Sequence, residues 1–229
     1  MTARPAGVTP KPAPSVAVHD ASLVENDKYY NAHGITLNSE DPALNPNIFL
    51  NVSTSPKVAV IIETRSPGYI VPLILHFSAV LGPSWPIIVY TEAENYGRFS
   101  TSAPFLRAQK TGRINVRSLP EGLYFPNWAS VSDFLTDTWL WKNLAPAESI
   151  LVFQADSILC SNSVRSVDDF LAYDMIGAPI MERYGKGYNG GLSLRKRSTF
   201  LKVLDEYEYG PKSKPHMEDQ WFYARSVSK

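Results

Sequence analysis

The sequence has little that would cross-link it or draw it to a polyanion. Cys160 is the only cysteine among 229 residues, so an intramolecular disulfide framework is excluded. Because Cys160 follows an apolar run and has no base-bearing motif beside it, we expect a buried structural thiol. Lys plus Arg and Asp plus Glu each total 22. This balance lacks the cationic excess of nucleic-acid binders, so no nucleic-acid partner is expected.

Long hydrophobic runs are also missing. No stretch reaches the roughly 18 to 20 apolar residues of a membrane-spanning helix. Pro5, Pro10, Pro12 and Pro14 interrupt the N-terminus, which therefore lacks the apolar segment of a signal peptide. We expect no membrane span, and a cytoplasmic protein rather than one of the Golgi or the secretory lumen.

Several enzyme motifs are absent too. There is no phosphate-binding loop of the form G-x-x-x-x-G-K-[ST], and no G-x-G-x-x-G follows the first apolar run. The nucleophile elbow of serine hydrolases and the paired histidines of zinc proteases are also missing.

What is present is an alternation of two patterns. Residues 1–55 are rich in Pro, Ala, Thr and Asn, and they predict a disordered or irregular N-terminal extension. Within residues 56–229, short apolar runs typical of buried strands alternate with segments of helical spacing. The expected strands are 58–62, 86–90, 114–119, 150–153, 175–177 and 191–195, and the expected helices 70–81, 105–110, 131–143, 167–173, 198–207 and 219–225. This order predicts an α/β domain with a mostly parallel central sheet and helices on both faces.

Two of the predicted strands end in polar residues. Glu63, Thr64 and Arg65 follow the first strand, and Gln154 and Asp156 follow the fourth. Ligands of open parallel sheets bind beyond the carboxyl ends of the strands. Arg65 could bind a phosphate and Asp156 could offer an oxygen ligand to Mg²⁺ or Mn²⁺. The alternative is that these residues only cap the elements that follow.

A second group of residues is rich in glycine. Gly190 and Gly191 precede a strand-like segment, and Lys186 lies in the loop before them. Paired glycines let a backbone approach a ligand closely, although a flexible connection explains them equally well. The basic residues 195–197 are interpreted as a solvated helix start.

A third candidate is the acidic pair Glu218 and Asp219, at the start of an aromatic helix pattern. Acids in a first helical turn are stabilised by the helix dipole, which is the simpler explanation. The functional explanation is a carboxylate that serves as a base or binds an acceptor.

In order along the chain, residues 154–156, 177–179, 188–195 and 218–222 resemble motifs of GT-A glycosyltransferases. Residues 57–225 are more closely similar to a mainly fungal family catalogued as domain of unknown function 5672. That similarity is carried by residues 60–65, 131–135, 151–157, 185–191 and the segment at Glu218. The resemblance implies a GT-A-like, Rossmann-like fold that binds a nucleotide sugar.

The resemblance also implies roles for residues. Asp156 takes the place of the last, metal-binding acid of an Asp-x-Asp motif, whereas Gln154 replaces the first acid and so weakens the metal site or leaves it to Asp156. Glu218 or Asp219 would be the catalytic carboxylate on the acceptor side. The residues implied to bind the nucleotide sugar are Glu63, Thr64, Arg65, Asp133, Gln154, Lys186, Asn189, Gly190 and Gly191.

The C-terminus departs from the same pattern. GT-A enzymes commonly supply a late metal ligand, often histidine, from a region beyond the Glu218 segment, and this chain ends at Lys229. His216 would have to substitute as that ligand. We therefore also expect the domain to be truncated, with impaired catalysis as one interpretation.

These implications define one expected function and two alternatives. The expected function is a hexosyltransferase-like enzyme that uses Mn²⁺ or Mg²⁺ to transfer a sugar from a nucleotide-diphosphate sugar to a hydroxyl acceptor, either a glycan or a small molecule. The alternatives are a non-catalytic module that binds a sugar or nucleotide sugar, as a truncated pseudoenzyme, and a nucleotidyltransferase.

Overall fold

The computed structural model describes residues 52–65, 67–99, 101–120, 122–213 and 217–226. All of them belong to the unit Ser39–Lys229. Residues 1–51, most of the predicted N-terminal extension, lie outside the described residues.

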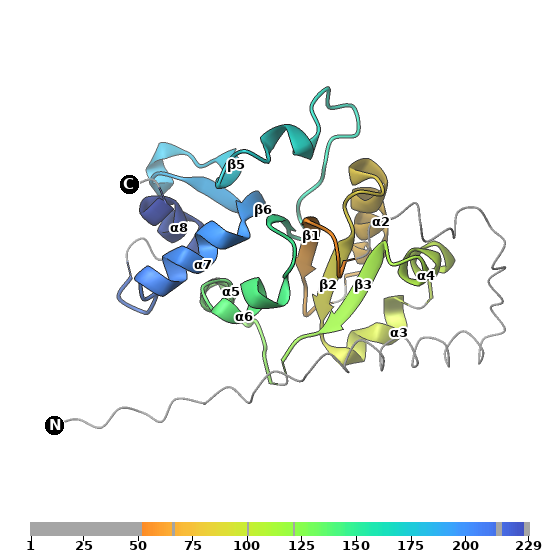
Figure 1. The fold of residues 1–229 in the computed structure, drawn as a ribbon. Helices are drawn as coiled ribbons and strands as arrows, with labels where there is room; N and C mark the ends of the chain where they lie inside the picture. Colours follow the sequence, from red (N-terminus) through yellow and green to blue (C-terminus); the bar gives the residue numbers. More distant parts are fainter. Residues whose placement is uncertain (1–51, 66, 100, 121, 214–216, 227–229) are drawn as a thin grey trace. The chain divides into compact units, whose positions relative to one another are not determined.

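A six-stranded sheet in the order β3-β2-β1-β4-β6-β5 forms the centre of the described unit (Figure 1). β1 pairs in parallel with β2 and β4, and β2 pairs in parallel with β3. β6 runs antiparallel to its two neighbours β4 and β5. The strands are β1 (Lys57–Ile62), β2 (Ile87–Thr91), β3 (Ile114–Ser118), β4 (Ser149–Phe153), β5 (Met175–Pro179) and β6 (Tyr188–Lys196). The predicted mostly parallel sheet is confirmed.

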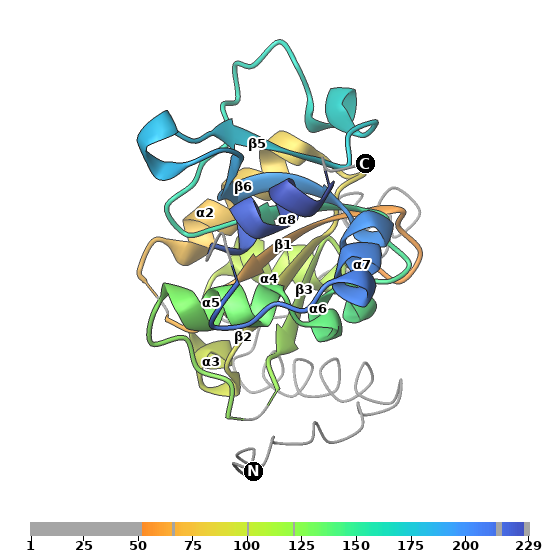
Figure 2. The same cartoon turned by 90° about the vertical axis from the view of Figure 1, so that its left-hand side faces the viewer.

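Helices cover the sheet on both faces, as predicted. Helices α2 and α4 lie on one side of it, and α5 to α8 lie on the other (Figures 1 and 2). The helices are α2 (Ile70–Leu81), α3 (Tyr96–Phe99), α4 (Ala103–Lys110), α5 (Trp128–Leu135), α6 (Thr138–Asn143), α7 (Arg197–Glu206) and α8 (Glu218–Ser226), with short 3₁₀ turns η3 (Ala93–Asn95), η4 (Val167–Phe170) and η5 (Glu182–Tyr184). Among the described residues, no helix is both long and apolar enough to cross a membrane.

The side chains of β1 show why the apolar runs are continuous. Val58 and Val60 pack into the core on the α5–α8 side, and Ala59 and Ile61 pack into the core on the α2–α4 side. All four are fully buried, because successive side chains of a strand point to opposite faces. A strand covered on both faces therefore needs an apolar residue at every position.

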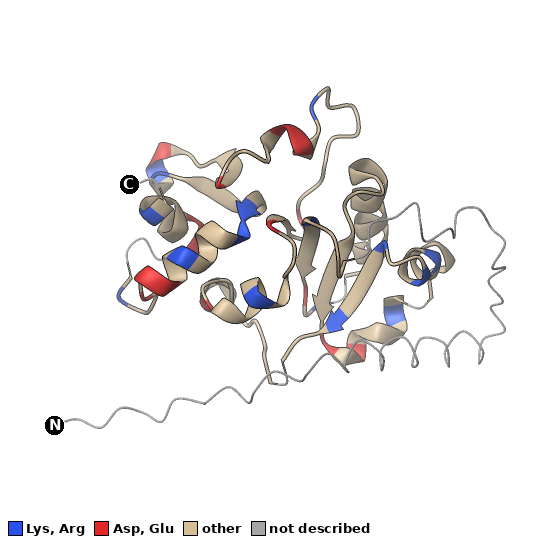
Figure 3. Cartoon of the chain, in the orientation of Figure 1, with Lys and Arg blue, Asp and Glu red and all other residues tan. Residues whose placement is uncertain are grey.

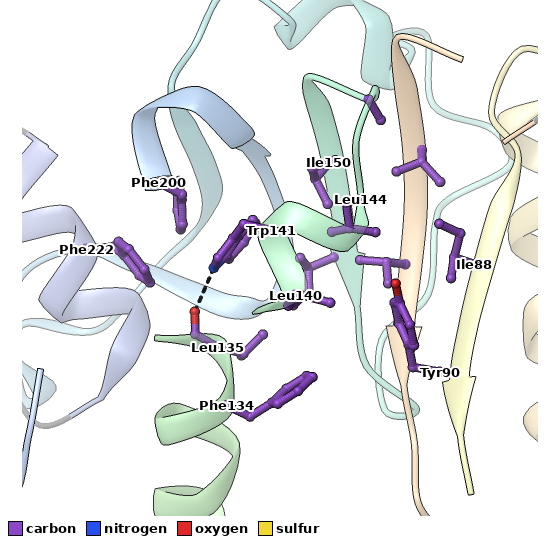
Figure 4. Packing of buried hydrophobic residues seen from close by; sticks show 14 of the residues in the cluster. Ile88, Tyr90, Phe134, Leu135, Leu140, Trp141, Leu144, Ile150, Phe200 and Phe222 are labelled. Carbon is purple, nitrogen blue, oxygen red and sulfur yellow. Dashed lines mark hydrogen bonds between the residues drawn. The ribbon is translucent and has the colours of Figure 1, made fainter. Parts of the chain in front are cut away.

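Trp141 lies at the centre of the core on the α5–α8 side (Figure 4). Its ring is 4.7 Å from that of Phe200 in α7 and 6.2 Å from that of Phe222 in α8. Its Nε1 donates a 2.9 Å hydrogen bond to the carbonyl oxygen of Leu135, at the end of α5. One residue thus joins four helices and fixes α8, which carries Glu218, beside β6.

Two predicted helices differ from the structure. The helix expected at residues 131–143 is two helices. Asp137 adopts an extended conformation between them and caps the start of α6, because its Oδ1 accepts a 2.6 Å hydrogen bond from the backbone N of Trp139. Asp competes with the helix ladder in this way and favours caps. The helix expected at residues 167–173 is only the 3₁₀ turn η4.

The predicted burial of Cys160 is wrong, since its side chain is exposed. The apolar run that precedes it ends with β4 at Phe153, and the chain then leaves the sheet in irregular turns. Sequence distance from a buried strand is therefore a poor guide to burial once the strand has ended.

Candidate functional site

Three predicted segments meet at one edge of the sheet. β1 and β4 are parallel neighbours, so Glu63 and Gln154, which follow them, leave the sheet at the same edge. β6 runs in the opposite direction and begins at this edge, with Leu192 paired to Phe153. The backbone N of Gln154 donates a 2.8 Å hydrogen bond to the carbonyl oxygen of Gly191. The segment Tyr188–Gly191, called the twin-glycine segment below, therefore lies beside the end of β4.

Arg65 presents a cation to solvent from this edge. Its side chain is 82% exposed, whereas the side chain of Glu63 is 7% exposed. The buried carboxylate accepts hydrogen bonds from Nε of Arg65 at 2.9 Å, from Nη2 at 3.2 Å and from the backbone N of Arg65 at 2.8 Å. A bidentate pair of this kind orients the planar guanidinium before any ligand binds. Among the described residues, Nη1 of Arg65 has no hydrogen-bond partner.

Two residues that the sequence did not suggest hold this loop in place. Thr91, at the end of β2, donates from Oγ1 to the carbonyl oxygen of Glu63 at 2.7 Å. Nδ2 of Asn95 donates to the carbonyl oxygen of Thr64 at 2.9 Å and to Oγ1 of Thr91 at 3.0 Å. The signal used for β1, a polar residue directly after an apolar run, could have found Thr91, whereas Asn95 lies further along the chain, in η3, and gives no such signal.

Asp156 is exposed after β4 and lies within electrostatic reach of Arg65. The hydrogen bond that Arg65 donates to Glu63 and the charge of Glu63 are the main causes that raise the pKa of Arg65, and the charge of Asp156 adds to them. Gln154 is exposed as well. The edge therefore carries one oriented cation and, within reach of its charge, one exposed carboxylate.

The chain by itself supplies only part of a metal site here. The described residues contain no group of three or more His, Cys, Asp or Glu that could hold a metal ion. Mg²⁺-type sites, however, commonly use one or two carboxylates and take further oxygens from substrate phosphates. Asp156 fits such a shared site. His216, the other predicted ligand, lies outside the described residues.

The twin glycines are closely packed at this edge. A Cβ on Gly191 would lie 2.7 Å from Oε1 of Gln154, and one on Gly190 would lie 2.6 Å from Nη2 of Arg195 and 2.8 Å from Oε1 of Glu218. Neither glycine has a positive φ. Packing against the chain's own side chains accounts for both glycines, and a close approach to a ligand stays a prediction.

Glu218 and Asp219 are buried at the start of α8, 7% and 8% exposed. Oε1 of Glu218 accepts a 2.9 Å hydrogen bond from Nη2 of Arg195, and Oδ2 of Asp219 accepts one of 2.8 Å from the backbone N of Gly190. The predicted solvated position of Arg195 is wrong, because its side chain is 0% exposed. The partner that makes burial possible lies 23 residues away, at Glu218, where sequence spacing gives no sign of it.

The remaining predicted residues lie on neighbouring elements. Lys186 is exposed in the loop of the β5–β6 hairpin, between Gly185 and Gly187, whose φ angles are 111° and 133°. Asp133 is exposed on α5. Burial is the main cause that raises the pKa of Tyr209, and the charges of Asp133 and Glu218 add to it. Figure 3 shows acidic and basic residues interspersed over the described elements.

The family follows from comparison with known sequences. Residues 113–229 match the family described as Protein of unknown function (DUF5672), and the chain belongs to that family. A comparison with curated proteins finds no match.

Solved structures with a similar fold include glycosyltransferases. One is the mannosyltransferase PcManGT from Pyrobaculum calidifontis in complex with GDP-Man and Mn²⁺, with 11% identity and a TM-score of 0.48, covering 92% of this chain and 61% of that one. Another is the glycosyltransferase GlyE of Streptococcus pneumoniae, with 13% identity and a TM-score of 0.46, covering 76% of this chain and 44% of that one. The chain thus spans less than two thirds of either protein. At such TM-scores neither likeness adds weight to a particular activity.

Proposed function

We propose that the protein transfers a sugar from a nucleotide-diphosphate sugar to a hydroxyl acceptor at the edge where β1 and β4 end. The observation that supports this most is that Arg65 and Asp156 follow neighbouring parallel strands and so leave the sheet there together. Arg65 is exposed yet oriented by the buried Glu63, and Asp156 is an exposed carboxylate within reach of its charge. A diphosphate suits the free edge of such a guanidinium.

The proposed reaction forms one bond, breaks one bond and transfers one proton. The acceptor oxygen forms a bond to the anomeric carbon, and the bond from that carbon to the diphosphate oxygen breaks. The electron pair leaves with the nucleoside diphosphate, and the hydroxyl proton passes to a base or to solvent. Arg65, with Lys186 from the β5–β6 hairpin, stabilises the negative charge that develops on the leaving group. A divalent cation, Mn²⁺ or Mg²⁺, would be held by Asp156 and would supply Lewis-acid stabilisation of the same group.

Other residues of the edge would shape the pocket for the donor. In this proposal Thr64 and Gln154 border the nucleotide, Asn189 and the twin glycines border the sugar, and Asp133 approaches from α5. Glu218 and Asp219 have two candidate roles: one of them accepts the acceptor's proton, or both support the twin-glycine segment.

A second candidate function is a non-catalytic module that binds nucleotide sugars. Two observations favour it. Gln154 stands where an acid of the metal motif is expected, and both oxygens of Asp219 are already engaged by backbone N–H groups at 2.8 Å and 2.6 Å.

One panel experiment separates these functions. The protein is incubated with nucleotide sugars and Mn²⁺, and both its melting temperature and the release of nucleotide are measured. Transfer predicts stabilisation with release. Stabilisation without release supports the binding module, and pyrophosphate formed from a nucleoside triphosphate and a sugar phosphate supports a nucleotidyltransferase.

Variants test the site itself. Asp156→Ala should abolish the metal-dependent part of the stabilisation, whereas Asp205→Ala, which removes an exposed acid from α7, should leave it intact. Arg65→Gln should weaken binding of the nucleoside diphosphate even without metal. If Asp156→Ala leaves metal-dependent binding unchanged, the assignment of the metal to Asp156 is wrong.

A further inference from the structure

A buried polar cluster joins β6 to the first turn of α8. Its central residue is Arg195, whose side chain is fully buried. Nε of Arg195 donates to Oγ of Ser193 at 2.9 Å, and Nη2 donates both to Oε1 of Glu218 at 2.9 Å and to the carbonyl oxygen of Gly190 at 3.2 Å. One guanidinium thus binds a helix acid and a backbone carbonyl at the same time.

Gly190 is held by both of its backbone groups. Its N donates to Oδ2 of Asp219 at 2.8 Å, and its carbonyl oxygen accepts from Arg195 at 3.2 Å and from Oγ of Ser193 at 2.9 Å. The space where a Cβ would stand is occupied by Arg195 and Glu218. The cluster therefore fixes the position of this residue and leaves no room for a side chain.

Gly190 is one residue from the contact with the end of β4. The carbonyl oxygen of Gly191 accepts from the backbone N of Gln154 at 2.8 Å. The N of Gly191 donates to Oδ1 of Asn189 at 2.9 Å. Any shift of Gly190 is thus transmitted to Asn189 and to the turn that carries Asp156.

We propose that Arg195, Glu218 and Asp219 form a positioning unit, which holds the twin-glycine segment against Gln154, two residues before Asp156, and does not exchange a proton with the acceptor. The inference rests on the proposed function for its consequence in catalysis. It is based on the hydrogen bonds that already engage both carboxylates. Both oxygens of Asp219 accept hydrogen bonds from backbone N–H groups, and Glu218 accepts one from Arg195.

The cation itself supports a positioning role over a purely stabilising one. Among the described residues, Nη1 of Arg195 is buried without a hydrogen-bond partner. The rings of Trp141 and Phe200 lie 5.9 Å and 5.4 Å from its guanidinium carbon. Buried ion pairs are often no more stabilising than apolar residues of similar volume. What the planar fork provides and an apolar residue cannot is simultaneous binding of the Gly190 carbonyl and Glu218.

Glu218→Gln in the full chain separates positioning from proton transfer. The amide oxygen of Gln can still accept from Arg195, so a positioning role predicts that kcat falls less than about tenfold. Gly190→Ala and Arg195→Lys, which disturb the positioning unit, should instead raise the KM for the donor about tenfold or more. Removing a general base costs about 10² to 10⁴ in rate. A loss of that size in Glu218→Gln, with the donor KM unchanged, would overturn the proposal.

Hydrogen exchange of backbone amides tests the positioning unit independently of catalytic turnover. At a temperature where every variant is folded by circular dichroism, Arg195→Lys should speed exchange at Gly190 and Gly191 at least about tenfold. The control Lys202→Met, which removes an exposed ion pair with Glu206, should not. Unchanged exchange in Arg195→Lys contradicts the positioning unit. If the wild-type protein binds no nucleotide sugar, but exchange is faster in Arg195→Lys than in the wild type and in Lys202→Met, the proposed function is refuted and the positioning unit stands.

Discussion

The ion pair between Arg195 and Glu218 makes a quantitative prediction about stability. The two side chains are 0% and 9% exposed, and their charged atoms are 2.9 Å apart. Arg195→Met leaves the Glu218 carboxylate buried without its cation, and Glu218→Leu leaves the guanidinium without its carboxylate. Breaking a buried pair by removing one partner costs about 3–5 kcal/mol. Each single variant should therefore lose free energy of unfolding in that range.

The double variant Arg195→Met/Glu218→Leu should be much less unstable than the sum of the two. Neither charge then remains buried alone, and Met at position 195 can pack against Trp141 and Phe200. Some loss persists, because the Gly190 carbonyl and the Ser193 hydroxyl lose a donor. We expect a coupling free energy of at least about 2 kcal/mol, within the range known for contacting residues.

Equilibrium unfolding in urea, followed by tryptophan fluorescence, measures all four corners of this cycle. The wild type, both single variants and the double variant should unfold with similar m-values, so that midpoints report stability. Additive losses within about 0.5 kcal/mol would show that the two charges are not coupled. That result would refute the coupling of the buried ion pair and, with it, the polar link between β6 and α8.

Two further predictions concern packing and ionisation. Gly177→Ala should lower the free energy of unfolding by about 1–3 kcal/mol, because its Cβ would lie 2.7 Å from the backbone oxygen of Asn189. Gly191→Ala should lower it by less than about 1 kcal/mol, because its Cβ meets the movable end of the Gln154 side chain. Equal losses of the two variants in thermal or urea unfolding would contradict this. Burial is the main cause that raises the pKa of Tyr90 above its unfolded value of 10.0, so its contribution to stability is fully present below pH 10.0 and is lost as the pH rises through the folded pKa. In Tyr90→Phe, the free energy of unfolding measured in urea should fall less steeply between about pH 9 and 11 than in the wild type. The same slope in both proteins would show that the pKa of Tyr90 is not raised in the folded state.

Much of the fold could be predicted because local patterns decide it. β1 is apolar at every core position since both faces are covered, and α2 begins and ends where its apolar spacing does. The break between α5 and α6 could not be predicted from apolar spacing, which continues through it. There a single cap by Asp137 outweighs the period of the hydrophobic residues.

The candidate site was predictable to the extent that it follows from strand ends. Arg65 and Asp156 come directly after apolar runs, and the topology brings them to one edge. The burial of Arg195 was not predictable, because a basic run at a helix start is normally solvated. Its environment depends on Glu218 of a later helix, and no spacing rule connects the two.

The central claim is that a diphosphate binds at the edge where β1 and β4 end. A crystal structure of the protein grown with a saturating nucleotide sugar and Mn²⁺ tests it most directly. The account predicts phosphate oxygens within hydrogen-bond distance of Arg65 and a cation in contact with Asp156. A nucleotide bound at another surface, or none at saturation, would contradict it.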